Sequence, residues 1–188
     1  KKFLEYDPLR CYYFRVVLTK KYGVNFDDSR VNLAGKNIRD EDLQNIGEAL
    51  KANNTLTYLS LDNNNITDVQ SIGELLKTNN TLTRLRLSNN NITDVQSIGE
   101  GLKTNNTLKY LYLHNNNITD DSGIQSIIDV LKTNNTLKYL HLDNNQLSDN
   151  MKSQLNAIKQ YKRDGSNGYQ QVEGLSLIHI SEPTRRTT

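Results

Sequence analysis

The leucines in the middle of the chain follow one pattern four times. The segments TLTYLSLDNNNITD, TLTRLRLSNNNITD, TLKYLYLHNNNITD and TLKYLHLDNNQLSD begin at Thr55, Thr81, Thr107 and Thr136, at offsets of 26, 26 and 29 residues. Within each segment the x-L-x-L part alternates polar and apolar residues with a period of two, which predicts a strand. A regular spacing of this kind is the signature of a repeat architecture.

After each predicted strand the apolar period changes to that of a helix. Capping boxes are predicted at three helix starts, namely Thr67-x-x-Gln70, Thr93-x-x-Gln96 and Ser122-x-x-Gln125. The last of these places the three extra residues of the third copy in the strand-to-helix loop, around Asp120 and Asp121. Each helix is followed by Asn-Asn, which predicts a left-handed turn at the helix end. The helical spacing is carried by Val69, Ile72, Leu75 and Leu76, and by Val95, Ile98 and Leu102.

Each copy reads L-x-x-L-x-L-x-x-N-x-[IL], and this motif resembles the leucine-rich repeat family. The resemblance covers residues 29–164, including a weaker first copy that has Lys36 in place of the asparagine. It implies an α/β solenoid, a horseshoe arc with a parallel sheet on the concave side and helices on the convex side. The repeat length resembles the ribonuclease-inhibitor-like class, which includes repeat domains of NOD-like receptors and Ran GTPase-activating proteins. Ribonuclease inhibitor itself is rich in cysteine, unlike this chain.

The segments outside the repeats divide into an N-terminal cap and a C-terminal region. Residues 1–28 form the cap region, in which Asp7-Pro8 and Gly23 delimit a predicted helix over residues 8–22 that covers the first repeat. A strand is the alternative, because Tyr, Phe and Val favour strands as well. The apolar stripe of this helix is Leu9, Tyr12, Tyr13, Val16 and Val17. A last amphipathic helix with Met151, Leu155 and Ile158 is expected to end the array.

The C-terminal residues have a different character. Residues 165–174 are polar and rich in glycine, and predict a flexible linker. Residues 175–185, LSLIHISEPTR, resemble one reading frame of a transposon-based sequencing adaptor. We therefore expect residues 175–188 to be a disordered read-through artefact, and the chain to be a fragment of its natural protein. A short apolar strand is the alternative for this segment.

The composition and the motifs that the sequence lacks exclude several classes of function. The net charge of +2 predicts no strong attraction to nucleic acid or to anionic membranes. Cys11 is the one cysteine, so an intrachain disulfide is excluded and a reducing, cytoplasmic location is favoured. The sequence has no nucleophile elbow, phosphate-binding glycine loop or H-E-x-x-H motif. We expect a non-catalytic monomer without cofactors.

Asparagines that follow the predicted strands have a structural interpretation. The resemblance implies that Asn64, Asn90, Asn116 and Asn145 point inward and bond the backbone of the turn, which buried backbone groups require. Seven N-x-T sequons also occur, and the repeating Asn-Asn-Thr and Asn-Ile-Thr segments account for them without any glycan. They lie at Asn53, Asn65, Asn79, Asn91, Asn105, Asn117 and Asn134.

The variable positions of the x-L-x-L segments predict a binding surface. Alternation places them on the solvent-facing side of the sheet, in three columns. Tyrosine and arginine recur there, and both are enriched at binding hot spots. The alternative is a merely solvated sheet face. The columns are Tyr58, Arg84, Tyr110 and Tyr139; Ser60, Arg86, Tyr112 and His141; and Asp62, Ser88, His114 and Asp143. All of these residues except Ser88 are predicted contacts.

We therefore expect an interaction module that binds another protein through its concave face. Two alternatives follow from particular features. The resemblance to Ran activators allows a GTPase-activating regulator, although no acidic tail follows the array. His114, His141 and Asp143 carry ligand types that suit zinc, but two surface histidines on a binding face explain their spacing better.

Overall fold

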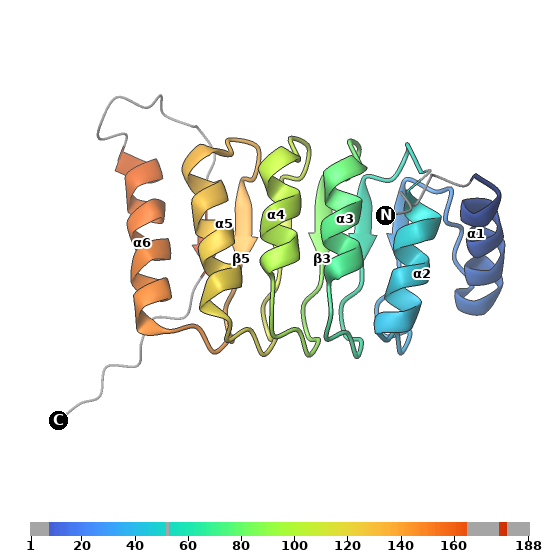
Figure 1. The fold of residues 1–188 in the computed structure, drawn as a ribbon, viewed down its shortest axis with the longest axis horizontal. Helices are drawn as coiled ribbons and strands as arrows, with labels where there is room; N and C mark the ends of the chain where they lie inside the picture. The colour runs from blue at the N-terminus through green and yellow to red at the C-terminus, as the bar shows by residue number, and fades with distance from the viewer. Residues whose placement is uncertain (1–7, 52, 165–176, 180–188) are drawn as a thin grey trace, which may run out of the picture.

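Strands and helices alternate along the whole repeat region. The computed structural model describes residues 8–51, 53–164 and 177–179, and its strands form one parallel sheet in the order β1-β2-β3-β4-β5-β6. The helices stand side by side in a row against this sheet (Figure 1). The strands are β1 Arg30–Asn32, β2 Tyr58–Ser60, β3 Arg84–Arg86, β4 Tyr110–Tyr112, β5 Tyr139–His141 and β6 Leu177–His179; the helices are α1 Pro8–Tyr22, α2 Asp40–Leu50, α3 Gln70–Thr78, α4 Gln96–Thr104, α5 Asp121–Thr133 and α6 Asp149–Asp164.

The hydrophobic core lies between the sheet and the helices. Leu59, Leu85, Leu111 and Leu140 are partners in register across neighbouring strands, and each is fully buried. Helix residues such as Ile72 and Leu76 close the core from the other side. Because each repeat buries its leucines against its neighbours, stability is shared along the row. The period-two and helical patterns of the repeats are thus confirmed as strands and helices.

The helix starts differ from the predicted capping boxes. Helix α3 begins at Gln70, three residues after Thr67, and the carboxylate of Asp68 accepts the Gln70 N–H at 2.7 Å. In the third copy, Asp120 is the N-cap and accepts from the backbone of the first turn. Helix α5 begins immediately after this cap and has 13 residues, whereas α3 has nine. The extra residues of the third copy therefore lengthen the helix and not the loop, contrary to the prediction. The expected threonine and serine boxes are therefore wrong: the N-cap residue of α3 is Val69, with Asp68 bonded to the backbone beside it, and the N-cap of α5 is Asp120.

The asparagines after the helices do not form left-handed turns, contrary to the prediction. Asn79, which follows α3, has an extended backbone with φ −76°. Its side-chain oxygen instead accepts the N–H of Leu82 at 2.7 Å, and its amide donates to the carbonyl of Asn53. The left-handed asparagines lie after the strands, where they make the tight turn that asparagine tolerates. They are Asn37, Asn63, Asn89, Asn115 and Asn144.

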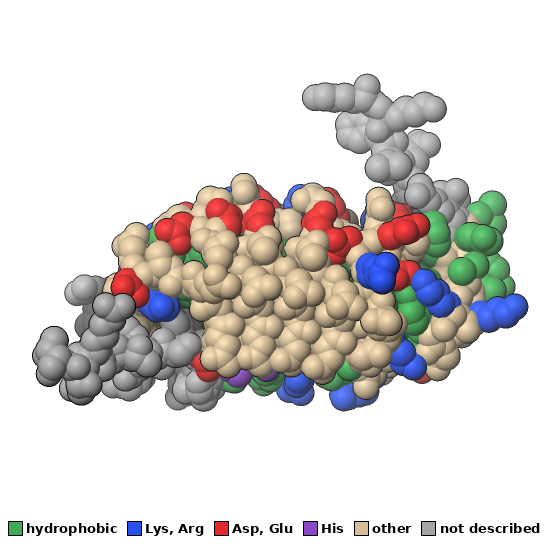
Figure 2. Space-filling model, turned by 90° about the horizontal axis from the view of Figure 1, so that it is seen from below, with side chains coloured by type: hydrophobic (Ala, Val, Ile, Leu, Met, Phe, Trp, Pro, Cys, Tyr) green, Lys and Arg blue, Asp and Glu red, His purple; other side chains and the backbone are tan. Residues whose placement is uncertain are grey.

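Helix α1 occupies the predicted residues and packs against α2, but the predicted apolar stripe is not the side that faces the core. The buried side of the helix is formed by Leu18 and Tyr22, with Phe14 partly buried. The exposed large apolar residues in the described part of the chain are Leu9, Tyr12, Tyr13, Val16 and Val17, and apolar side chains gather at this end of the molecule in Figure 2. The helix is apolar on two sides, so the spacing alone does not decide which side packs inward.

The C-terminal segment contradicts the expected disorder at three residues. Leu177–His179 form β6, which pairs in parallel with β5, with Tyr139 opposite Leu177 and His141 opposite His179. The last strand of a repeat sheet has unpaired N–H and C=O groups, and a short apolar segment satisfies them. The strand alternative is correct for these residues. The predicted linker at 165–174 and the rest of the segment lie outside the described residues.

Helix α6 supplies the predicted end of the array. Met151 and Leu155 are buried, and Ile158 packs at the edge of the core. No helix in the described part of the chain has both the length and the apolar character to cross a bilayer.

Candidate functional site

The asparagines after the strands tie neighbouring repeats together. The amide of Asn90 donates to the carbonyls of Leu61 and Leu87 at 3.0 and 3.1 Å, and its oxygen accepts the Ile66 N–H at 3.1 Å. Asn64, Asn116 and Asn145 make equivalent bonds. Their polar groups are used inside the fold, so they are not available to a partner.

A second asparagine row, which sequence reasoning missed, lies at the helix ends. Asn53, Asn79 and Asn105 are buried, and each bonds the backbone of its own repeat and of the preceding one. Asn134 continues the row. The signal was present in the sequence as the repeated Asn-Asn-Thr. These sequon asparagines serve the backbone, in agreement with the structural interpretation of the sequons.

The sheet face opposite the helices, which we call the concave face, carries the predicted columns. The register pairs Tyr58 with Arg84, Arg84 with Tyr110, and Tyr110 with Tyr139. The second column pairs Arg86 with Tyr112 and Tyr112 with His141. All of these aromatic and cationic side chains are half-buried. They therefore lie against one another while keeping part of their surface in water.

Cations stack on tyrosine rings across neighbouring strands of the concave face. Arg84 lies 4.6 Å from the ring centroid of Tyr110, and Arg86 lies 5.0 Å from that of Tyr112. At the first strand, Arg30 lies 4.4 Å from the ring of Tyr58. Sequence reasoning missed Arg30, although aligning Val31 with the strand leucines would have placed it in this column. Such contacts hold the guanidinium planes in fixed orientations.

Ser60 and Asp62, two of the predicted contacts, are buried and do not offer an open surface. Ser60 is 2% exposed and Asp62 is 4% exposed. Asp62 forms an ion pair with Arg86 and accepts the Ser88 N–H at 2.8 Å. Burial alone would lower the pKa of Arg86, but its hydrogen bond with Asp62 raises it. Ser60 is a short side chain whose register neighbours, Asn32 and Arg86, are both longer.

Two histidines form a stacked pair toward the C-terminal end of the concave face. The rings of His114 and His141 have centroids 4.1 Å apart. Ser88 Oγ lies 2.9 Å from His114 Nδ1, and Asp143 Oδ2 lies 2.9 Å from His141 Nε2. Burial, together with the charge of His141, lowers the pKa of His114 below its usual value. Tyr112 contacts both rings edge-on.

The zinc alternative gains no support from this geometry. Within the part of the chain that the structure describes, no three histidine, cysteine or acidic side chains converge as metal ligands. One nitrogen of each ring already has a hydrogen-bond partner, Ser88 for His114 and Asp143 for His141. The pair is better described as part of the aromatic surface.

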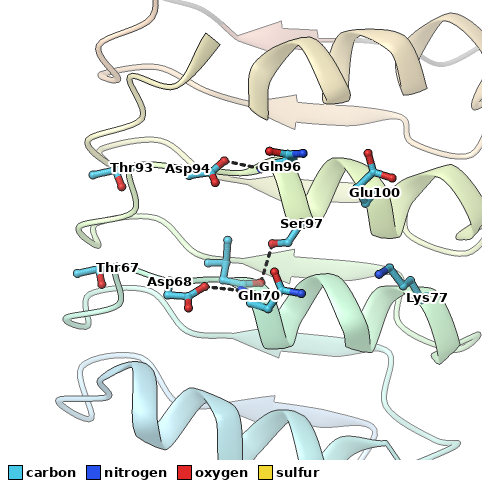
Figure 3. Close-up of a pocket in the computed structure, with 10 residues that line it drawn as sticks. Thr67, Asp68, Gln70, Lys77, Thr93, Asp94, Gln96, Ser97 and Glu100 are labelled. Carbon is cyan, nitrogen blue, oxygen red and sulfur yellow. Dashed lines mark hydrogen bonds between the residues drawn. The ribbon is translucent and has the colours of Figure 1, made fainter. Parts of the chain in front are cut away.

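A polar groove of about 640 Å³ lies between α3 and α4. Figure 3 shows Asp68 and Asp94 at the starts of the two helices and Lys77 and Glu100 farther along them. Both aspartates accept backbone N–H groups at 2.7 Å, from Gln70 and Gln96. Because the same residues recur in both repeats, and the two aspartates are already bonded to the backbone at the helix starts, the groove follows from stacking the repeats and is not a specialised site.

Comparisons with known proteins agree with this architecture. A family model described as leucine-rich repeats in two copies matches residues 80–126, and a second leucine-rich repeat model matches residues 52–69 and 133–150. The comparison with curated proteins found no match.

Two solved structures show the same fold. The actin-binding site 2 of leiomodin-1 is 24% identical, with a TM-score of 0.60, and the match covers 84% of this chain and 89% of that one. The tropomodulin C-terminal domain of Caenorhabditis elegans is 16% identical, with a TM-score of 0.58, over 80% and 94% of the two chains. The chain thus contains leucine-rich repeats and folds as a leucine-rich-repeat solenoid.

Proposed function

We propose that this chain is a non-catalytic interaction module that binds a partner protein on its concave face. The observation that carries the proposal is the continuous surface of stacked arginine, tyrosine and histidine side chains on β2 to β5. The leucines of the same strands fill the core without help from these rings. A rigid sheet that presents aromatic and cationic anchors is suited to binding, because little side-chain entropy is lost on contact.

The proposed contacts are the predicted residues that keep exposed surface. Tyr112 and Tyr139 pack with ring centroids 5.1 Å apart, and they join the arginine-rich strands to the histidine pair. Asp62 acts instead as the support of Arg86. The proposed contact set is Tyr58, Arg84, Arg86, Tyr110, Tyr112, His114, Tyr139, His141 and Asp143.

The structural neighbours support protein binding as a use of this fold. The leiomodin-1 structure is an actin-binding site, so actin is the first purified protein to test as a partner. We also propose that the repeats are of the ribonuclease-inhibitor-like class, and the helices α3 to α5, of nine to 13 residues, support this proposal. The GTPase-activating alternative and a cytoplasmic location remain predictions. Stimulated GTP hydrolysis by a small GTPase would favour the former.

An affinity experiment tests the proposal. The Arg84→Ala/Tyr110→Ala/Tyr112→Ala variant and a matched variant on the helices, Gln70→Ala/Lys77→Ala/Lys103→Ala, are immobilised beside the parent. Each is exposed to purified actin and to a lysate of the source organism. We expect the parent and the helix variant to retain the same proteins and the concave variant to lose them. Recovery of the same proteins by all three would contradict the proposal.

A further inference from the structure

Charges are distributed unequally between the two sides of the solenoid. Acidic residues concentrate on the helices and the turns that lead into them, as in Asp40, Glu41 and Asp42 of the first turn of α2. Figure 2 shows most acidic side chains along the upper margin, and the histidines with several Lys and Arg side chains along the lower margin. The net charge of +2 is small, so the difference between the two sides arises because acidic and basic residues lie in different places.

The basic side has one row of cations at the N-terminal ends of the strands. Arg30 and Arg84 begin β1 and β3, and Lys109 and Lys138 directly precede β4 and β5. The backbone bond from Lys138 N–H to the Lys109 carbonyl places the two lysines side by side. Neighbouring parallel strands lie about 4.8 Å apart, so the row presents cations at intervals of one or two strand spacings.

Among the described residues, the cations of this row have no acidic partner. The ion pairs among the described residues use none of Arg30, Arg84, Lys109 and Lys138. The carboxylates on the concave face, Asp62 and Asp143, lie after the strands and face Arg86 and His141. The row is therefore a basic strip at the N-terminal edge of the sheet, where Lys109 and Lys138 lie one register position before Tyr110 and Tyr139.

Arg84 can also bind a carboxylate. Its guanidinium lies 4.6 Å from the Tyr110 ring centroid, and the half-buried side chain keeps part of its surface accessible. A carboxylate that meets the edge of a guanidinium forms two parallel hydrogen bonds, the strongest type of charged contact available to arginine. Tyr110 thus acts as the support and Arg84 as the recognising group.

We infer that the partner of the concave face is a protein with an acidic segment that crosses the strands along Arg84, Lys109 and Lys138. This inference rests on the proposed function and specifies its partner. A single-stranded nucleic acid fits less well. Bases need open ring faces for stacking, whereas arginines lie against the rings of Tyr58, Tyr110 and Tyr112.

Selection from a library of random linear peptides tests the inference on the full chain. The parent is compared with Arg84→Glu/Lys109→Glu/Lys138→Glu and with a charge-matched helix variant, Lys77→Glu/Lys103→Glu/Lys132→Glu, which also reverses three cations. We expect the parent to select peptides enriched in Asp and Glu. The concave reversal should weaken the binding of those peptides by about tenfold or more, and less so at high salt. The helix variant should bind like the parent, and thermal melts establish that all variants are folded.

Other outcomes separate the two proposals. Selected peptides without acidic enrichment, whose binding still requires Tyr110 and Tyr112, would overturn the acidic partner and leave the concave face as the binding surface. Peptides that bind all variants equally, or no selected peptide at all, would contradict both. Oligothymidylate provides the test for nucleic acid. If the parent binds it more tightly than the acidic peptides, and the Arg84→Glu/Lys109→Glu/Lys138→Glu variant does not bind it, the partner is a nucleic acid and the inference is overturned.

Discussion

Replacement of Asn90 by leucine is expected to lower the free energy of unfolding by about 1–3 kcal/mol. The Asn90 oxygen accepts the buried N–H of Ile66, and the substitution leaves that N–H without a partner. The carbonyls of Leu61 and Leu87 each keep another asparagine donor, from Asn64 and Asn116. The predicted cost therefore comes mainly from one orphaned donor. Equilibrium denaturation of parent and variant measures it.

The neighbouring asparagine provides the control for this prediction. Asn91 is exposed, and no hydrogen bond of its side chain occurs among the described residues. Asn91→Leu makes the same chemical change one position away and should alter the free energy of unfolding by less than about 0.5 kcal/mol. If Asn90→Leu and Asn91→Leu unfold alike, the asparagine row does not have the structural role assigned to it.

Replacement of Gly73 by alanine is the second substitution with a large expected effect. A Cβ at Gly73 would lie 2.6 Å from the carbonyl carbon of Ser97, because α3 and α4 approach closely there. Backbone atoms cannot rotate away, so the helices must separate. We expect a net loss of about 1–3 kcal/mol from overpacking, despite the higher helix propensity of alanine, which favours the variant by about 1 kcal/mol.

Gly47 is the matched position for this test. The nearest atom to a Cβ there is Cβ of Ser71, at 3.2 Å, so the contact is tight but leaves room for a small adjustment. Thermal denaturation of Gly47→Ala should show a clearly smaller loss than that of Gly73→Ala, or a gain from helix propensity. Equal stability of Gly73→Ala and the parent would mean that α3 and α4 are not packed as closely as described.

The repeat motif made the fold predictable, because the strand leucines face inward in every copy. The same alternation placed Arg84 and Tyr110 in one column on the open side. The ends of the elements were less predictable. Thr67 and Asp68 both favour an N-cap by residue type, yet the N-cap residue of α3 is Val69, and only the three-dimensional turn decides this. Helix α1 is another case, since side chains on both of its faces are apolar.

The sequence predicted which residues lie on the concave face, but not how exposed each of their side chains is. Alternation marks Asp62 as outward-facing, yet Arg86 from the next strand covers it. A contact between two residues that lie 24 positions apart in the sequence cannot be predicted from a local pattern. The Arg30 stack on Tyr58 was missed for a related reason, because the first repeat lacks the motif asparagine that identifies the other copies.

Site-specific cross-linking measures the binding surface most directly. A photoreactive benzoyl-phenylalanine replaces Tyr110 on the concave face in one protein and Gln96 on α4 in another, and each is irradiated with the partner recovered by the parent. We predict a cross-linked product from position 110 and none from position 96. A product from position 96 alone would place the binding surface on the helices and contradict the assignment of the concave face.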